Sequence, residues 1–237
     1  ALMIGDKVLS AGGEGPDAVM AVINYFEGNP LFNAGIGATC TAEGTFELDA
    51  CIMEGKDLSA GAVAGLKHVK HPINAAYAVK TKSPHVMLSG AGAEEFAKEQ
   101  GLEMVEDNMY FATPKTMEWI EKLKQESKKN GTVGCVVLDK QGNLTAGTST
   151  GGMFKKRWGR IGDSPVIGAG TYADNNSCAV SCTGHGEYFI RHAVAFDVCA
   201  RYKYLKESVE KAADYIIHTE LNTNAGNGGL IAVDKLG

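Results

Sequence analysis

Apolar residues in the first half of the chain repeat with two different periods, and the two periods alternate along the sequence. Residues 16–26 place apolar side chains at helical spacing, with proline in the first turn and glycine just after the end. Residues 45–53 alternate with the period of a β-strand. The same reasoning predicts shorter strands at 60–65 and 85–88 and helices at 73–80, 93–99 and 113–129. Interleaved strands and helices favour an α/β (α+β) fold.

Two segments between these elements lack a hydrophobic pattern. Residues 89–92 resemble half of a phosphate-binding glycine loop, but the third glycine and the later acidic partner are not at the right spacing, so we interpret them as a plain turn. Residues 122–130 are very polar, and we expect them to be exposed and mobile. The next residues are Gly131 and Thr132, where the character of the chain changes abruptly.

A hairpin is predicted from Thr132 onward. Residues 132–138 form a strand pattern, 139–143 a turn, and 144–148 a second strand. Symmetric pairing about Gln141 places Thr132 opposite Thr150, with Cβ atoms roughly 4.5 to 5.5 Å apart, close enough for their hydroxyls to hydrogen-bond. The alternative is that both threonines are there only for their β-propensity.

The position of Thr132 also suits a nucleophile that becomes a new N-terminus when the chain cleaves itself. Gly131 and the polar segment before it allow the backbone to contort, as an attack of the threonine hydroxyl on the preceding carbonyl requires. A threonine at a new N-terminus carries its own base, because an α-amine has an unperturbed pKa of about 7.7 to 8.0. No serine elbow, metalloprotease helix or cysteine-protease signature competes with this hypothesis.

A cation and an anion follow on a glycine-rich loop. Arg160 can bind a carboxylate bidentately, and Asp163 can accept hydrogen bonds from an α-ammonium group, so the two together fit an α-amino acid. A simple surface salt bridge is the alternative.

Further on, a strand at 178–183 leads into Gly184, His185, Gly186 and an amphipathic helix from Glu187 to about Tyr204. Backbone N–H groups at a helix start favour negative charge, so the Thr183 hydroxyl and the Gly184 N–H are candidate oxyanion donors. We interpret His185 as a positioning group, because the α-amine already supplies a base.

Composition narrows the kind of partner. The chain has 237 residues, 44% of them hydrophobic, which is enough for one sizeable core, and a formal net charge of −5 without a basic run. Small-molecule substrates are therefore expected, with no nucleic acid and no membrane partner, since no apolar run is long enough to span a bilayer. The six cysteines are expected to be reduced. Cys178 and Cys182 would lie ~13 Å apart on one strand, which disfavours a zinc site.

Together these residues resemble a known family, the plant-type L-asparaginases and isoaspartyl aminopeptidases (β-aspartyl peptidases) of the N-terminal-nucleophile hydrolases. The resemblance covers nearly the whole chain. Glycosylasparaginases and threonine aspartases match less well, the former at the Leu-Phe-Asn-Ala-Gly segment and the latter at the position of Asp163. The matching motifs lie in order at residues 29–38, 47–50, 61–65, 131–134, 148–152, 159–165, 168–170 and 183–187.

The resemblance implies a four-layer αββα sandwich made by a single domain, 1–237, which autoproteolysis between Gly131 and Thr132 divides into an α-subunit (1–131) and a β-subunit (132–237). It implies L-asparagine and β-aspartyl dipeptides as substrates, no catalytic cofactor, and a dimer of αβ heterodimers. The cytoplasm is the expected compartment, with the periplasm or secretion as alternatives. Residue by residue, it implies catalytic roles for Thr132, Thr150, Thr183, Gly184 and Asn33, and substrate binding by Arg160, Asp163, Thr183, Gly184 and Gly186.

Two further expectations come from the resemblance. One is a structural Na⁺ or K⁺ ion held by carbonyls of a loop, at Phe26, Glu27, Asn29, Phe32, Ala34 and Ile36. The other is a longer natural chain, because the N-terminal strand of the family and its last strands are not present in these 237 residues. An uncleaved, inactive precursor or binding protein remains the alternative to an enzyme.

Overall fold

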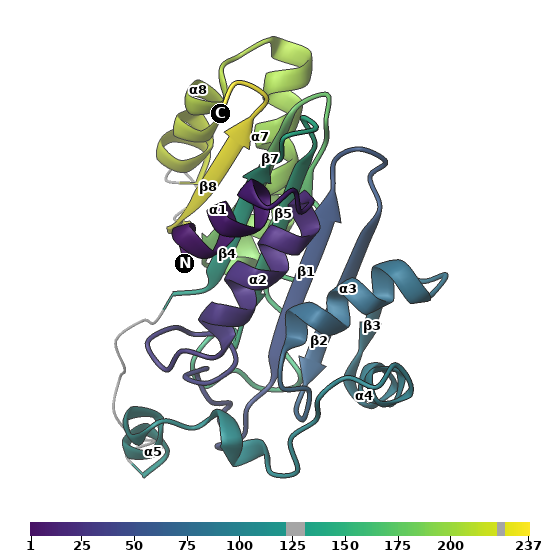
Figure 1. The fold of residues 1–237 in the computed structure, drawn as a ribbon. Coiled ribbons are helices and arrows are strands. Elements are labelled where there is room, and N and C mark those ends of the chain that lie inside the picture. The colour runs from purple at the N-terminus through teal and green to yellow at the C-terminus, as the bar shows by residue number, and fades with distance from the viewer. Residues whose placement is uncertain (122–130, 222–225) are drawn as a thin grey trace.

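The structure is a computed structural model that describes residues 1–121, 131–221 and 226–237. Two β-sheets pack face to face, and helices cover the outer face of each, which gives the four layers α, β, β and α (Figure 1). This is the predicted αββα sandwich. The part of the predicted helix 113–129 that lies in residues 122–130, and the predicted mobility of that segment, fall outside the described residues.

The larger sheet has five strands in the order β3-β2-β1-β5-β4. Only β2 and β3 run parallel; the other neighbours are antiparallel. β1 was expected to begin near residue 45 but begins at Leu48, and it is buried along its whole length because both faces of the sheet are covered. The strands are β1 (Leu48–Glu54), β2 (Ala60–Leu66), β3 (Met87–Ser89), β4 (Val133–Leu138) and β5 (Leu144–Thr150).

Helices α1 to α4 lie in the first half of the chain, and α2 and α3 cover the outer face of the larger sheet. The predicted helices at 16–26 and 73–80 are confirmed as α2 and α3. The predicted plain turn at 89–92 is wrong, because the first turn of α4 begins at Gly90. The bounds are α1 (Leu2–Ser10), α2 (Gly15–Glu27), α3 (Pro72–Lys82), α4 (Gly90–Glu99) and α5 (Pro114–Glu121), with a 3-10 turn at Asn108–Phe111.

The smaller sheet is antiparallel in the order β6-β7-β8, with β6 (Thr171–Ala173), β7 (Cys178–Gly184) and β8 (Gly228–Asp234). The helix predicted from Glu187 to Tyr204 is not continuous. It divides into α6 (Gly186–Arg191), α7 (Val194–Ala200) and a π-helical turn (Arg201–Leu205), because Ala193 takes a left-handed conformation with φ of 46°. α8 (Val209–Tyr215) and a second π-helical turn (Ile216–Leu221) complete this outer layer.

The layer between the two sheets contains a polar network as well as apolar side chains. The Thr148 hydroxyl of β5 lies 2.7 Å from the Ser181 hydroxyl of β7 and accepts a hydrogen bond of 2.6 Å from the Thr171 hydroxyl of β6. Gly134 of β4 lets the sheets approach closely, because a Cβ at this position would overlap the Ser181 side chain. The sheets are thus fixed to each other near the strand ends that carry the candidate nucleophile.

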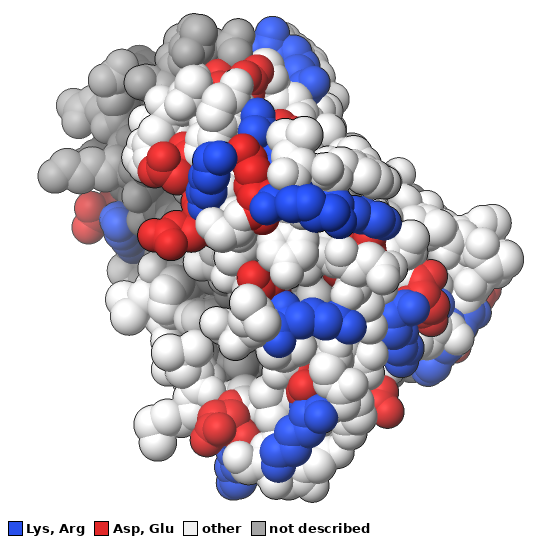
Figure 2. All heavy atoms as spheres, turned by 90° about the horizontal axis from the view of Figure 1, so that it is seen from above, with Lys and Arg blue, Asp and Glu red and all other residues white. Residues whose placement is uncertain are grey.

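The surface shows no concentration of one charge on the face seen in Figure 2. Lys and Arg side chains lie there beside Asp and Glu side chains. Among the described residues, every helix is too short or too polar to cross a bilayer.

Candidate active site

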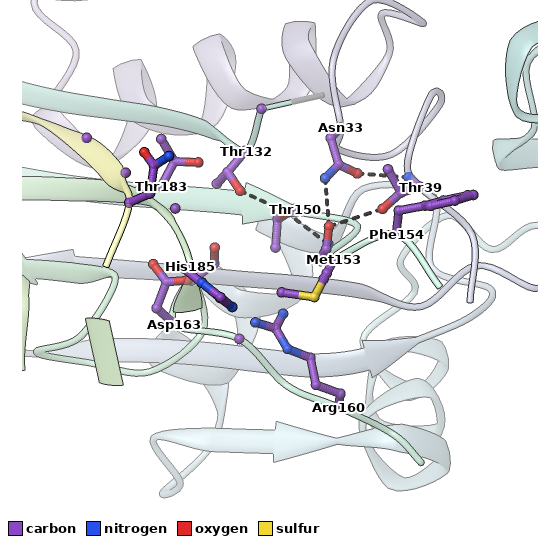
Figure 3. Close-up of a pocket in the computed structure, with 18 of the residues that line it drawn as sticks. Asn33, Thr39, Thr132, Thr150, Met153, Phe154, Arg160, Asp163, Thr183 and His185 are labelled. Atoms are coloured by element: carbon purple, nitrogen blue, oxygen red, sulfur yellow. Dashed lines mark hydrogen bonds between the residues drawn. The ribbon is translucent and has the colours of Figure 1, made fainter. Parts of the chain in front are cut away.

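One cavity of about 680 Å³ lies where β4 begins, β5 and β7 end, and β8 begins. Its lining includes Thr132, Thr150, Thr183 and Gly184 from these strand ends, together with loop residues between 152 and 164 (Figure 3). A cavity of this volume is typical of small-molecule sites. The structure therefore brings together residues that lie far apart in the sequence, because Asn33 and Gly229 both line this cavity.

The two threonine hydroxyls face each other as the hairpin pattern predicts. Thr132 Oγ1 lies 2.9 Å from Thr150 Oγ1, and either hydroxyl can be the donor. The predicted register is confirmed by the pairs Val133–Ser149 and Gly134–Thr148 in the adjoining ladder. The N–H of Gly152 also donates to Thr150 Oγ1 at 3.0 Å. We call Thr132 and Thr150 the threonine pair.

Asn33 fixes the chain on both sides of this pair. Its backbone N–H donates to the carbonyl of Gly131 at 3.2 Å, and its carbonyl accepts from the Gly151 N–H at 3.0 Å. Its side-chain amide donates to the Gly152 carbonyl at 2.8 Å and accepts from the Thr39 N–H at 2.8 Å. The spacing of residues around Asn33 gave no sign of this role, which only the family resemblance implied, because the contacts span about 100 residues.

Asp163 lines the same cavity as the threonine pair and has an incompletely satisfied carboxylate. Its side chain is buried, with 5% of the residue exposed, and Oδ2 has no hydrogen-bond partner among the described residues. Burial raises the pKa of Asp163 to about 6, and the charge of Arg160 opposes this increase. A buried acceptor without a donor is a place where a ligand's ammonium group can bind.

Arg160 lines the same cavity, but its guanidinium is paired with a residue that sequence analysis missed. Nε and Nη2 donate to the two carboxylate oxygens of Glu187 at 2.9 and 3.0 Å. This bidentate pair lowers the pKa of Glu187. The alternative of a simple ion pair between Arg160 and Asp163 is not what the structure shows. An acidic residue in the first turn of α6 was the signal that could have pointed to Glu187.

Gly186 lies behind these side chains and does not line the cavity. A Cβ at this position would come within 2.8 Å of both Arg160 Nη2 and Asp163 Oδ1. A glycine is therefore needed here so that the two charged groups can occupy their positions. This role differs from the expected one, in which Gly186 contacts the substrate directly.

Thr183 and Gly184 are the last two residues of β7, and both line the cavity. The helix α6 begins at Gly186, so Gly184 belongs to the strand end and not to a helix N-terminus as expected. His185 also lines the cavity; its Nε2 lies 3.7 Å from Glu187 and its ring is packed edge-on against Tyr188. These contacts fit a positioning role.

The loop after α2 was expected to hold a cation through six carbonyls. Those of Phe26, Glu27 and Asn29 already accept N–H groups from Asn29, Ile36 and Phe32. Within the described residues, the carbonyls of Phe32, Ala34 and Ile36 accept none. Glu27 contributes no carboxylate, because its buried side chain accepts from Ser149 and the Ile73 N–H and contacts His71. Oxygen ligands of this kind suit Na⁺ or K⁺.

The cysteines offer no comparable site. All six are free thiols, and Cys178 of β7 lies near Cys199 of α7, with the sulfurs 2.9 Å apart. Among the described residues, no three His, Cys, Asp or Glu side chains gather closely enough to hold a metal ion.

Layered α+β architecture of this kind, with strand ends opening into one cavity, is that of the N-terminal-nucleophile hydrolases. The chain belongs to the asparaginase family, whose sequence model matches residues 1–237. It is 48% identical to an isoaspartyl peptidase of Salmonella typhimurium over 98% of this chain and 79% of that protein. It is 46% identical to an isoaspartyl peptidase of Escherichia coli (98% and 77%) and 44% identical to an isoaspartyl peptidase/L-asparaginase of Mus musculus (98% and 73%).

Proposed function

We propose that this hydrolase is activated by its own cleavage between Gly131 and Thr132, and that it then releases ammonia from L-asparagine and cleaves β-aspartyl dipeptides. The observation that carries the proposal is the threonine pair, which lies in one cavity with Arg160 and Asp163. The names of the relatives support both substrates.

For self-cleavage, Thr132 Oγ attacks the carbonyl carbon of Gly131. The N–H of Asn33 donates to that carbonyl oxygen and so stabilises the negative charge that develops on it. The bond between the Gly131 carbon and the Thr132 nitrogen breaks as the proton that the hydroxyl loses passes to this nitrogen, leaving an ester on Oγ and a free α-amine. Water then hydrolyses the ester, which divides the single domain 1–237 into 1–131 and 132–237.

For turnover, the new α-amine takes the proton of the Thr132 hydroxyl, and Oγ attacks the β-carbonyl carbon of the substrate. Thr150, which accepts from Gly152, can donate its own hydroxyl hydrogen to Thr132 Oγ. Thr183 and Gly184 stabilise the oxyanion. The leaving amine takes a proton and departs, and water hydrolyses the β-aspartyl ester to aspartate.

Recognition of the substrate uses the two charged side chains. Asp163 accepts from the α-ammonium group, and Arg160 binds the α-carboxylate once the guanidinium is shared with or released from Glu187. Gly186 provides the space for both groups.

Mass spectrometry and two assays test the proposal. We expect the purified chain to convert on incubation into fragments comprising residues 1–131 and 132–237, and the processed protein to release ammonia from L-asparagine and aspartate from β-aspartyl dipeptides. Persistence of one uncleaved chain without activity would instead support an inactive precursor or binding protein.

We also propose that a Na⁺ or K⁺ ion binds the carbonyls of the loop 26–36, since three of them have no N–H donor among the described residues. Replacing choline chloride by NaCl or KCl at equal ionic strength is expected to raise the Tm by a few degrees, because a bound ion stabilises only the folded state. Equal Tm values in all three salts would contradict this proposal.

A dimer of αβ heterodimers in the cytoplasm is proposed on the family resemblance. Light scattering on the processed protein measures its oligomeric state, and cell fractionation determines its compartment.

A further inference from the structure

The cavity wall carries one more positive charge than an α-amino acid needs. Its lining contains the cations Arg160 and Lys155 and the carboxylate Asp163. L-Asparagine has one α-carboxylate and one α-ammonium group, which Arg160 and Asp163 can bind. A β-aspartyl dipeptide has a second carboxylate, at the end of its leaving residue. The charges of the wall therefore complement the dipeptide better than asparagine.

The second cation lies near Phe154, because Lys155 Nζ is 5.5 Å from the centroid of that ring. Figure 3 shows Phe154, the chain neighbour of Lys155, on one side of the threonine pair and Thr183 and Asp163 on the other. An acyl group held by Asp163, with its oxygen near Thr183, fills that second side. The remaining substituent of the reacting carbon is the leaving nitrogen, which then points toward the side of Phe154, whose chain neighbour Lys155 also lines the cavity.

The backbone fixes Lys155, while its ammonium group stays available. The N–H of Lys155 donates to the Cys40 carbonyl at 3.0 Å. The backbone φ of Lys155 is 60°, a value that residues other than glycine rarely adopt. Nζ lies 5.5 Å from the centroid of the Phe154 ring. No carboxylate in the described parts of the chain lies within ion-pairing distance of it. The next residue, Lys156, is by contrast buried and donates to the Glu47 carbonyl at 2.9 Å.

We propose that Lys155 is a specificity-determining residue that binds the C-terminal carboxylate of β-aspartyl dipeptides, with Phe154 and Met153 forming the apolar wall beside the leaving side chain. The inference rests on the proposed function and says which feature of the substrate separates dipeptides from asparagine. His185, the third basic residue of the lining after Arg160 and Lys155, lies 3.7 Å from the Glu187 carboxylate, whereas Lys155 has no such neighbour among the described residues.

A double comparison of protein charge and substrate charge tests this. The substrates are β-aspartyl-leucine, the same compound with its C-terminal carboxylate converted to an amide, and L-asparagine. The variants are Lys155→Gln and, as a matched control, Arg157→Gln, which removes a positive charge from an exposed side chain two residues away that does not line the cavity. Mass spectrometry first establishes that both variants are processed to the same extent as the wild type.

We expect the wild type to prefer the dipeptide acid to its amide by about fivefold to twentyfold in kcat/KM, as a partly exposed charge-assisted hydrogen bond allows. Lys155→Gln should lose this preference through a higher KM for the acid, with asparagine hydrolysis unchanged. Arg157→Gln should keep it.

The outcomes separate the two proposals. Equal use of acid and amide by an active wild type, or an undiminished preference in Lys155→Gln, overturns the role of Lys155 and leaves the proposed function standing. If Lys155→Gln fails to fold, Lys155→Met supplies the same comparison, and equal use of acid and amide by the wild type overturns the role of Lys155 without any variant. A wild type that is processed but hydrolyses none of the three compounds overturns the proposed function itself.

Discussion

Replacing Thr132 by alanine is expected to leave one intact chain and to lower hydrolysis of both asparagine and β-aspartyl dipeptides by at least about 10⁴-fold. The variant loses the Oγ that attacks Gly131 and the substrate, and without cleavage it also lacks the α-amine that acts as base. The hydrogen bond of 2.9 Å to Thr150 is lost at the same time. Gel electrophoresis or mass spectrometry follows processing, and ammonia release follows turnover.

Thr132→Ser is the matched control, since it keeps the hydroxyl and, after cleavage, the amine. It should be processed and active, at a reduced rate. A circular dichroism spectrum equal to that of the wild type shows that the alanine variant is folded. Substantial hydrolysis by a folded Thr132→Ala variant would remove Thr132 from the role of nucleophile.

The second large effect is expected from Asp163→Asn, which should lower kcat/KM for asparagine roughly 10²- to 10³-fold. The change keeps the shape of a buried side chain but removes the one carboxylate that the described lining of the cavity offers to the substrate's α-ammonium group. Most of the loss should appear as a higher KM. Succinamate, which is asparagine without its α-amine, supplies the comparison: the wild type should discriminate strongly against it, and the variant should discriminate little. Equal discrimination by both proteins would place the ammonium group elsewhere.

The pH profile gives the same residue a second test. Burial raises the pKa of Asp163 to about 6, so the carboxylate is ionised above that pH and becomes protonated below it. The α-amine of processed Thr132 must also lose its proton, at a pKa near about 7.7 to 8.0 if it is unperturbed. For the wild type, log kcat/KM should therefore fall with slope one below the amine's pKa and with slope two below about 6. Asp163→Asn should retain only the first of these limbs.

How much of this site the sequence predicts depends on how far apart the contacting residues lie in the chain. The Thr132–Thr150 contact follows from a strand period of two and a short turn, and the turn is well defined because Asp139 Oδ1 accepts from the N–H groups of Gln141 and Asn143. Local pattern and local geometry were sufficient there.

Contacts between segments that are distant in the sequence could not be predicted from local pattern. The hydrogen bond from Asn33 to Gly131 depends on how the loop after α2 approaches the start of β4, and the Arg160–Glu187 pair depends on how α6 faces the loop before β6. The helix expected from residue 187 to 204 has a continuous apolar pattern, yet the left-handed Ala193 interrupts it, and alanine carries no sequence signal for that conformation. None of these three features follows from the local pattern of the sequence.

The hydrogen bond between the Asn33 N–H and the Gly131 carbonyl also has a consequence for the kinetics of self-cleavage. Gly131 is part of the cavity wall before cleavage, so the first amide that Thr132 meets is the one on its own nitrogen. Maturation would then be a unimolecular event, with a half-time that does not depend on how much protein is present. Each molecule would serve once as its own substrate, and breaking the peptide bond between Gly131 and Thr132 would release the amine that makes later reactions catalytic.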